Sequence, residues 1–308
     1  MIVKSTLALL LLLGCASAEI GQAEPGPVAA RMRNVYLHMG YGVDLQVDDL
    51  RGHLESRKPG PPTFDDIESY SVALDYARVA MSAASLTNLL NDYVFAGGDA
   101  PIKNLSIAIE GNELVQTGTL KKGVPVPFKM RATVVVAPDG RLRLHPTSMK
   151  AAGFISKRVL DFFGLELEKL VKVKGDRGVA VDGDDLLLDT ERMLPPPRIR
   201  GRVTKATIER GQMVLLFGDA SKKGLEPPAA RANYMYYKGG TLRFGKLTMV
   251  DADLLLTDAD QHDAFDFSPE KYNDQLVAGY SKNTRSHGLI VYMPDANDLT
   301  KAAPRKPS

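Results

Sequence analysis

Apolar and polar residues alternate along much of the chain with the period of two that is typical of half-buried β-strands. The first clear run extends from Val43 to Asp48, where three apolar residues alternate with three polar residues. Gly111-Asn112 and Pro138-Asp139-Gly140 are turn sequences between two such runs. Further runs cover residues 71–82, 105–118, 126–136, 203–208 and 213–217. Because the apolar residues share one side of each run, the pattern predicts an antiparallel sheet packed on one face.

Two segments depart from this period and predict helices. Ser85 is a candidate N-cap for a short helix that ends near Val94. From Phe154 to Val173, apolar residues cover more than one helical stripe, so this helix must be enclosed on several sides or lie against lipid. The basic residues that flank it suit anionic headgroups, but they are equally consistent with a core helix whose lysines lie in water.

The N-terminal residues have the order of a signal peptide: the charge of Lys4, an apolar run from Leu7 to Leu13, and then small residues. The run is shorter than the roughly 20 residues that span a bilayer. Residues 1–18 are therefore expected to direct export to the periplasm or an envelope membrane surface. Cleavage before Glu19 and lipidation of Cys15 at a lipobox-like sequence both fit, and residues 19–30 are expected to be a flexible tether.

Composition narrows the class of protein. The 308 residues carry a formal net charge of +2, which gives no support for nucleic-acid binding. Cys15 is the only cysteine, so no disulfide forms within the chain. After the tether we expect a main domain at residues 31–218, a β-rich extension at 219–294 and a disordered basic tail at 295–308.

Motifs for catalysis or cofactor binding are missing from the sequence. There is no Gly-x-Ser-x-Gly elbow, no phosphate-binding loop, no dinucleotide-binding turn and no His-Glu-x-x-His pair. The five histidines are scattered. We therefore assign no catalytic residue, no metal ligand and no cofactor, and we favour a protein that is not an enzyme.

One acidic stretch stands out between residues 251 and 266. Its members are Asp251, Asp253, Asp258, Asp260, His262, Asp263 and Asp266. The spacing does not match an EF-hand loop, because the turn glycine and the closing glutamate are missing. Solvated strand and turn residues, a Ca²⁺ site and acid–base chemistry are the three interpretations, and the first is favoured.

Residues 85–217 show a familiar order of features: the helix at Ser85, a hairpin that ends in Gly118, the strand after Gly123, the Asp139-Gly140 turn, a helix, and prolines at 194–197 before a closing hairpin. This order resembles the LmeA-like family of exported bacterial proteins, which is similar in fold to tubular lipid-binding proteins. The resemblance implies an α+β fold in which a long curved antiparallel sheet wraps around a hydrophobic helix. It also implies an apolar groove for phospholipid acyl chains.

The expected function is therefore binding or carrying of phospholipid or another acyl lipid at a membrane surface. The groove would be lined by Phe128, Met130, Val134, Phe154, Val159, Leu160, Phe162 and Phe163, with Lys150, Lys157 and Arg158 near the headgroup. The driving force would be burial of apolar surface. The alternative is a structural or protein-interaction component of the cell envelope. In that case the same strands enclose a dry core and the 219–294 extension binds another protein, whose identity the sequence does not give.

Overall fold

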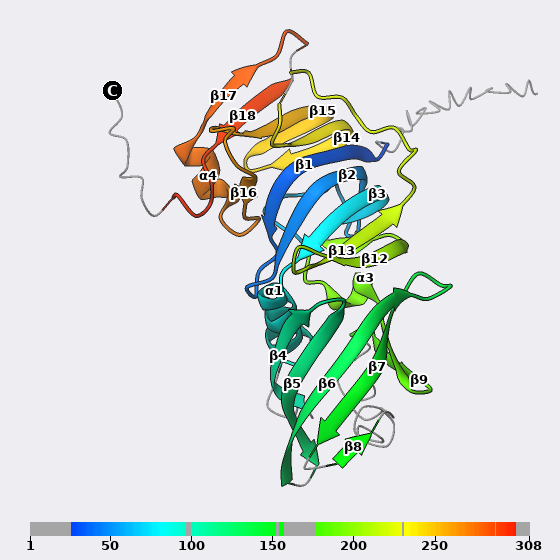
Figure 1. The fold of residues 1–308 in the computed structure, drawn as a ribbon. Helices are drawn as coiled ribbons and strands as arrows, with labels where there is room; N and C mark the ends of the chain where they lie inside the picture. The colour runs from blue at the N-terminus through cyan, green and yellow to red at the C-terminus, as the bar shows by residue number, and fades with distance from the viewer. Residues whose placement is uncertain are drawn as a thin grey trace, which may run out of the picture.

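The structure is a computed structural model that describes residues 26–96, 100, 102–122, 124–151, 154–156, 177–229, 231–286 and 288–299. Strands dominate the described residues and form two predominantly antiparallel sheets, one above the other in Figure 1. This confirms the prediction of a β-rich, antiparallel fold, but the single long sheet that was expected is two sheets. No helix within the described ranges is long and apolar enough to cross a membrane.

The larger sheet has eleven described strands, with the order β12-β13-β3-β2-β1-β14-β15-β18-β17; β11 also pairs with β3, and β16 with β1. Pairing is antiparallel except for β1–β16, β3–β11 and β15–β18. The strands are β1 (Val28–His38), β2 (Asp44–Ser56), β3 (Tyr70–Met81), β11 (Arg198–Arg200), β12 (Val203–Glu209), β13 (Gln212–Gly218), β14 (Tyr234–Phe244), β15 (Leu247–Asp258), β16 (Phe265–Phe267), β17 (Tyr280–Asn283) and β18 (Leu289–Met293).

The smaller sheet has seven described strands in the order β4-β5-β6-β7-β10-β9, and β8 pairs with β7. It is formed by residues between β3 and β11, so it is an insertion into the larger sheet's sequence. The strands are β4 (Ile102–Glu110), β5 (Glu113–Lys122), β6 (Val124–Val136), β7 (Leu142–Ala151), β8 (Phe154–Ser156), β9 (Val179–Asp182) and β10 (Asp185–Leu188).

Short helices connect the two sheets and cover the larger one. They are α1 (Ala83–Asn88), the π-helix η1 (Leu89–Val94), α3 (Thr190–Met193) and α4 (Tyr272–Ala278). Ser82 caps α1, because its hydroxyl accepts a hydrogen bond from the Ser85 backbone N–H at 3.0 Å. The prediction of a helix here is confirmed, but Ser85 is a buried residue inside it and not the N-cap.

The alternation read from the sequence sets which side chains enter the interior. On β6, Phe128, Met130 and Ala132 are all buried, whereas Lys129 between them is exposed. Phe128 pairs with Gly118 on the neighbouring strand β5, and a Cβ at Gly118 would lie 3.1 Å from the Phe128 ring. Glycine at this position therefore lets the ring lie close against β5.

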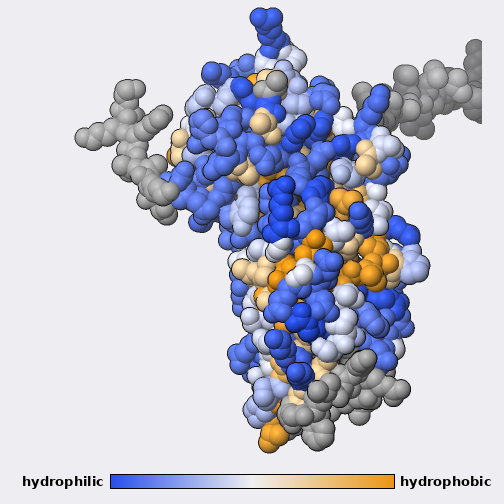
Figure 2. Space-filling view, viewed as in Figure 1, coloured by the Kyte–Doolittle hydropathy of each residue, from blue (hydrophilic) through white to orange (hydrophobic). Residues whose placement is uncertain are grey.

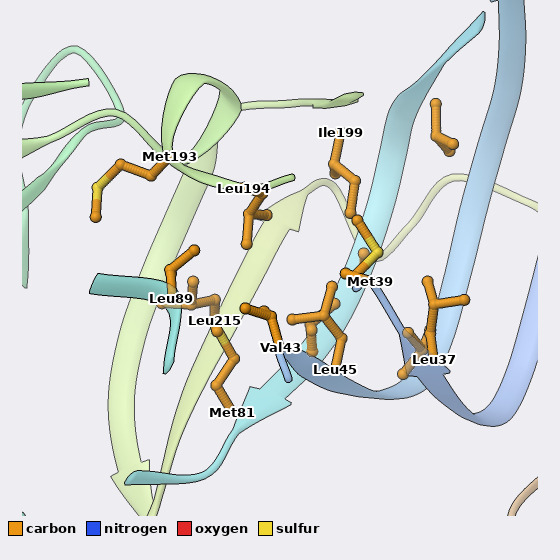
Figure 3. Close-up of a cluster of buried hydrophobic side chains, with 14 of the residues drawn as sticks. Leu37, Met39, Val43, Leu45, Met81, Leu89, Met193, Leu194, Ile199 and Leu215 are labelled. Atoms are coloured by element: carbon orange, nitrogen blue, oxygen red, sulfur yellow. The ribbon is translucent and has the colours of Figure 1, made fainter. Parts of the chain in front are cut away.

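A continuous core joins the two sheets. Figure 3 shows Leu37 and Met39 in the interior of the larger sheet, with Met81 at the end of β3, and Leu89 of η1 and Met193 of α3 beyond them, toward the smaller sheet. All five side chains belong to one buried cluster. The two sheets are therefore joined by packed side chains as well as by the chain itself.

Both faces of the larger sheet are covered near β14. Phe64, from the loop after β2, packs against Tyr237 of β14 and Tyr272 of α4, with ring centroids 5.3 and 5.8 Å apart. On the other face, Leu225 of the 219–232 loop packs on a second buried cluster that contains Tyr236. This explains why Tyr234–Tyr237 are consecutively buried instead of alternating.

Several boundaries expected from the sequence differ in the structure. Residues 28–30, assigned to the tether, begin β1 because Val28 and Ala30 are buried against the rest of the sheet. The 219–294 segment is not a separate extension, because β14 forms an antiparallel ladder with β1. Ala296, assigned to the tail, is buried, and its N–H donates to the Asp266 carbonyl at 3.0 Å.

The prediction of a long hydrophobic helix from Phe154 to Val173 is wrong at its first residues. Residues 154–156 form β8, which pairs with the end of β7 through Ala151 and Phe154. Three residues of ladder pairing satisfy backbone groups that a helix would have bonded internally. Residues 157–173 lie outside the described residues.

Candidate ligand cavity

An apolar cavity lies where the smaller sheet meets the larger one. Its walls come from β4–β7, β9 and β10 on one side, and from α1, η1, α3, β3 and β13 on the other. The cavity volume is about 90 Å³. Figure 2 shows hydrophobic surface gathered at the same level of the molecule, around β12, β13 and α3.

The cavity walls carry no charged side chain among the described residues, and Gln116 and Thr190 are the polar residues there. The apolar wall is formed by Met81, Leu86, Leu89, Leu90, Phe95, Ile102, Leu105, Ile107, Leu114, Phe128, Met130, Leu142, Leu144, Val179, Leu186, Leu188, Met193, Leu194, Met213 and Leu215. Water in such a space would find few partners, and apolar cavities of this kind stay dry and bind apolar molecules.

Methionine makes the wall adaptable. Met81, Met130, Met193 and Met213 approach the cavity from four different elements. Unbranched thioether side chains repack at low cost, which is why methionine is common at surfaces that accept varied apolar ligands. The cavity can therefore change shape by side-chain rotation.

Gln116 is the unusual member of the wall. It lies on β5 and is 6% exposed. Leu114, two residues earlier on the same strand face, also lines the cavity. Within the described part of the chain, the Gln116 amide forms no hydrogen bond, so a polar group enters an apolar space without a partner.

The structure brings two of the expected groove residues to the cavity. Phe128 and Met130 line it, whereas Val134 is partly buried elsewhere against the core. The side chains of Phe154, Val159, Leu160, Phe162 and Phe163 lie outside the described residues. The rest of the wall, which comes from the other strands and from the short helices, was not predicted. Period alone shows that a residue is buried and not which strand or helix it faces.

Of the three residues expected near the headgroup, the structure describes Lys150. Lys157 and Arg158 lie outside the described ranges, and so does the expected lipidation site, Cys15. Lys150 is exposed on β7 and does not line the cavity. Its neighbour Met149 points into the core. Lys150 also pairs across the sheet with Lys129. The two lysines therefore form a positive spot on the outer face of the sheet.

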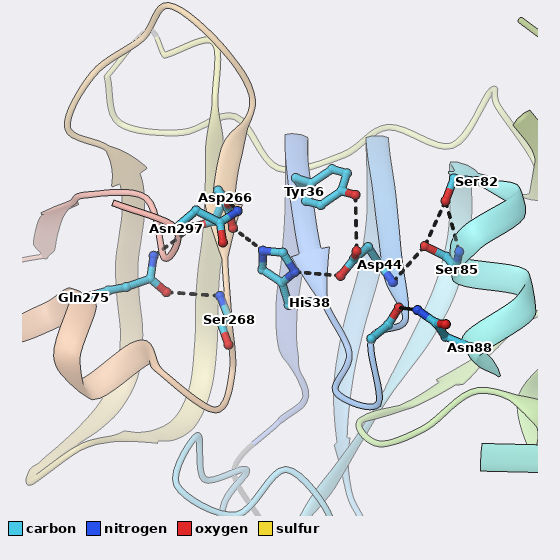
Figure 4. Close-up of polar contacts among 11 residues, drawn as sticks. Tyr36, His38, Asp44, Ser82, Ser85, Asn88, Asp266, Ser268, Gln275 and Asn297 are labelled. Atoms are coloured by element: carbon cyan, nitrogen blue, oxygen red, sulfur yellow. Dashed lines mark hydrogen bonds and ion pairs between the residues drawn. The ribbon is translucent and has the colours of Figure 1, made fainter. Parts of the chain in front are cut away.

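A polar network lies beside the cavity, at the end of the β1–β2 hairpin (Figure 4). His38 bonds through Nδ1 to Asp44 Oδ1 at 2.6 Å, and through Nε2 to Asp266. The Asp44 backbone N–H donates to Ser85 in α1 at 3.3 Å. On the far side, Asn297 donates to Asp266. The network thus joins β1, β2, α1, β16 and the segment after β18.

The network holds His38 in its charged form. Hydrogen bonds to Asp266 and Asp44 raise the pKa of His38 from 6.5 to about 9, against the lowering effect of burial. An imidazolium with both nitrogens donating has no free lone pair at neutral pH, so it is a poor general base. We interpret the network as a tie between elements and not as an active site.

The acidic stretch identified in the sequence is divided in the structure, and its last member, Asp266, belongs to the His38 network. Asp251 and Asp253 lie on β15, and Asp253 accepts a hydrogen bond from Tyr236 at 3.1 Å. Asp258 and Asp263 instead lie near Asp295. Asp295 was missed because 32 residues separate it from Asp263 in the sequence.

Comparison with models of protein families, with curated proteins and with solved structures finds no match for this chain. The functional argument therefore rests on the cavity and its surroundings.

Proposed function

We propose that the protein binds an acyl chain or a comparable apolar molecule in the cavity between its two sheets. The main support for this proposal is the composition of the cavity wall, which among the described residues is apolar apart from Gln116 and Thr190. Each Å² of apolar ligand surface removed from water contributes about 25 cal/mol, and no described wall residue carries a charge that binding would desolvate.

The ligand class follows from size and polarity. A volume of about 90 Å³ suits the end of an acyl chain and not a whole phospholipid, so a longer chain requires the methionine side chains to move. The unpartnered Gln116 amide suits a ligand with an uncharged hydrogen-bonding group, such as an ester carbonyl or a hydroxyl. A lipid with one chain inserted and its headgroup outside meets both conditions.

The location belongs to the same proposal. Export directed by residues 1–18, with or without lipidation of Cys15, would place the cavity at an envelope membrane, where acyl lipids are the abundant apolar ligands. The resemblance of residues 85–217 to the LmeA-like family supports this.

Filling the cavity tests the proposal directly. Leu144 lies on β7, with its side chain in the cavity wall, so Leu144→Phe inserts an aromatic ring into the space that a ligand would use. We expect this variant to bind a fluorescent acyl-chain probe at least about tenfold more weakly, a difference of ~1.4 kcal/mol. The measurement is a fluorescence titration, with circular dichroism and thermal unfolding to show that the variant folds.

Leu247→Phe is the matched control. Leu247 is 46% exposed on β15 and does not line the cavity, so the same substitution there should leave probe binding unchanged. Equal binding by Leu144→Phe and wild type, or no saturable binding by wild type, would contradict the proposal. The latter result would instead favour the envelope interaction protein with a dry core.

A further inference from the structure

Three carboxylates meet outside the cavity, where two parallel strands end. Asp258 is the last residue of β15, and Asp295 follows β18 by two residues. β15 and β18 pair in parallel with Asp258 opposite Met293, so the two carboxylates reach the same edge of the sheet. Asp263 comes from the turn after β15. One oxygen of each of the three side chains lies within 4.8 Å of the others.

Backbone hydrogen bonds orient two of these side chains. Asp258 Oδ1 accepts from the Asp260 N–H at 2.9 Å, and Asp295 Oδ1 accepts from the Asp266 N–H at 2.8 Å. The residue Asp258 is only 2% exposed, and its other oxygen, Oδ2, is buried without a hydrogen-bond partner among the described residues. Leaving a buried carboxylate oxygen unpartnered is costly, which points to a ligand that the polypeptide itself does not supply.

The charge of the group is also uncompensated. None of the three carboxylates forms a salt bridge with a basic residue in the described part of the chain. Burial, with the neighbouring carboxylates Asp295, Asp260 and Asp263, raises the pKa of Asp258 to about 7, although its bond to the Asp260 N–H opposes this. Burial likewise raises the pKa of Asp295 to about 6. A bound cation would remove this repulsion.

We propose that Asp258, Asp263 and Asp295 bind a divalent cation, and that Ca²⁺ is the ion that fits best. Oxygen-only ligands select Ca²⁺, Mg²⁺ or Mn²⁺ over Zn²⁺, which favours nitrogen and sulfur. Ca²⁺–oxygen distances of about 2.3–2.6 Å allow ligands on opposite sides to be roughly 5 Å apart. The observed separations lie within this limit. Mg²⁺ demands near-ideal octahedral geometry and usually keeps several waters, so a group of three carboxylates suits Ca²⁺ better.

The proposed site is open to solvent on one side, and water can supply the ligands that the carboxylates do not. Asp263 is exposed, so an ion enters from solvent on that side. Three carboxylates supply between three and six oxygens according to whether each binds through one or both, and water completes the shell of six to eight. Because Asp263 and Asp295 lie in connecting segments, the ion would tie the turn after β15 to the segment after β18.

The test is isothermal titration calorimetry of the chelator-treated, full-length protein with CaCl₂, repeated with MgCl₂, together with thermal unfolding. We expect saturable Ca²⁺ binding with a dissociation constant between about 10⁻⁵ and 10⁻³ M and weaker Mg²⁺ binding. Unfolding should shift to higher temperature with added Ca²⁺, because the ion binds the folded state alone. Asp258→Asn and Asp263→Asn should each weaken Ca²⁺ binding at least about tenfold, since each removes a ligand charge.

The two variants and a control separate binding from folding. Without Ca²⁺, Asp258→Asn should unfold at a temperature equal to or above that of wild type, because it removes a repelling charge. Asp263 is exposed, so Asp263→Asn still tests Ca²⁺ binding if the buried Asp258→Asn variant does not fold. Asp251→Asn, on the same strand but outside the group, should bind Ca²⁺ as wild type does; its backbone has a positive φ of 52°, which asparagine tolerates. No Ca²⁺ binding by wild type, or unchanged binding by both test variants, would overturn the proposal.

Discussion

Gln116 is the residue at which the cavity's polarity is most easily changed. Its buried amide forms no hydrogen bond within the described residues and faces apolar neighbours. We expect Gln116→Leu to raise the free energy of unfolding of the ligand-free protein by roughly 1 kcal/mol or more, because an unsatisfied buried polar group is removed. Chemical denaturation of the delipidated protein measures this change.

The same substitution should separate two kinds of ligand. A lipid whose carbonyl or hydroxyl group bonds Gln116 should bind Gln116→Leu more weakly, by the ~0.5–1.5 kcal/mol of one hydrogen bond, whereas a plain hydrocarbon should not. Gln212→Leu is the control, because Gln212 is partly exposed at the start of β13, does not line the cavity, and donates through its amide to Gln46 at 3.4 Å. Destabilisation by Gln116→Leu would show that the amide has a partner in the empty protein.

Individual residues of the cavity were partly predictable from sequence. Phe128 and Met130 were identified by the period-of-two pattern, which follows directly from strand geometry. In the run at residues 105–118, the same period puts Gln116 on the same strand face as Leu114. It gave no sign that the amide would lack a partner, because partners come from other elements and are not encoded in local spacing.

At the scale of elements, the strands β4–β7 of the smaller sheet and the hairpin turns at Gly111-Asn112 and Pro138-Asp139-Gly140 were predictable, since turns and alternation are local signals. Two failures have a common physical cause. The start of the expected helix at Phe154 is a strand because β7 offers it a ladder. The supposed extension is part of the larger sheet because β14 pairs with β1, some 200 residues earlier. Tertiary pairing overrides local pattern in both cases.

The charged His38, which links β1, β2 and β16, predicts that the stability of the fold depends on pH. The folded-state pKa is about 9, above the unfolded value of 6.5, so the stabilisation is complete below about pH 6.5 and is lost as pH rises through 9. We expect the wild-type free energy of unfolding to fall across this window by up to about 3 kcal/mol, since one pKa unit corresponds to ~1.4 kcal/mol. Denaturation at a series of pH values measures the slope.

Two variants show whether His38 is the source of this slope. His38→Gln should flatten it, since glutamine does not titrate. His145→Gln should keep it, because His145 is an exposed residue whose bond to Asp185, at 2.7 Å, lies on the smaller sheet. A His38→Gln variant with the full wild-type slope would show that His38 does not tie β1, β2 and β16 together through its charge.

At the scale of the whole molecule, the junction of the two sheets is the central feature. The smaller sheet is inserted between β3 and β11, and its apolar face meets α1, α3 and β13 around the cavity (Figures 1 and 3). No local sequence signal predicts this junction, because it depends on which faces two separate sheets turn toward each other. The proposed ligand would therefore contact both sheets at once and stabilise their arrangement.

Native mass spectrometry of the protein purified without detergent from its native envelope, followed by organic extraction, tests the lipid-binding claim most directly. We predict a bound acyl lipid at a defined stoichiometry that is lost in Leu144→Phe and retained in Leu247→Phe. The N-terminal mass in the same spectrum distinguishes acylated Cys15 from cleavage before Glu19. A lipid-free mass for well-folded wild-type protein, with no lipid in the extract, would contradict the account.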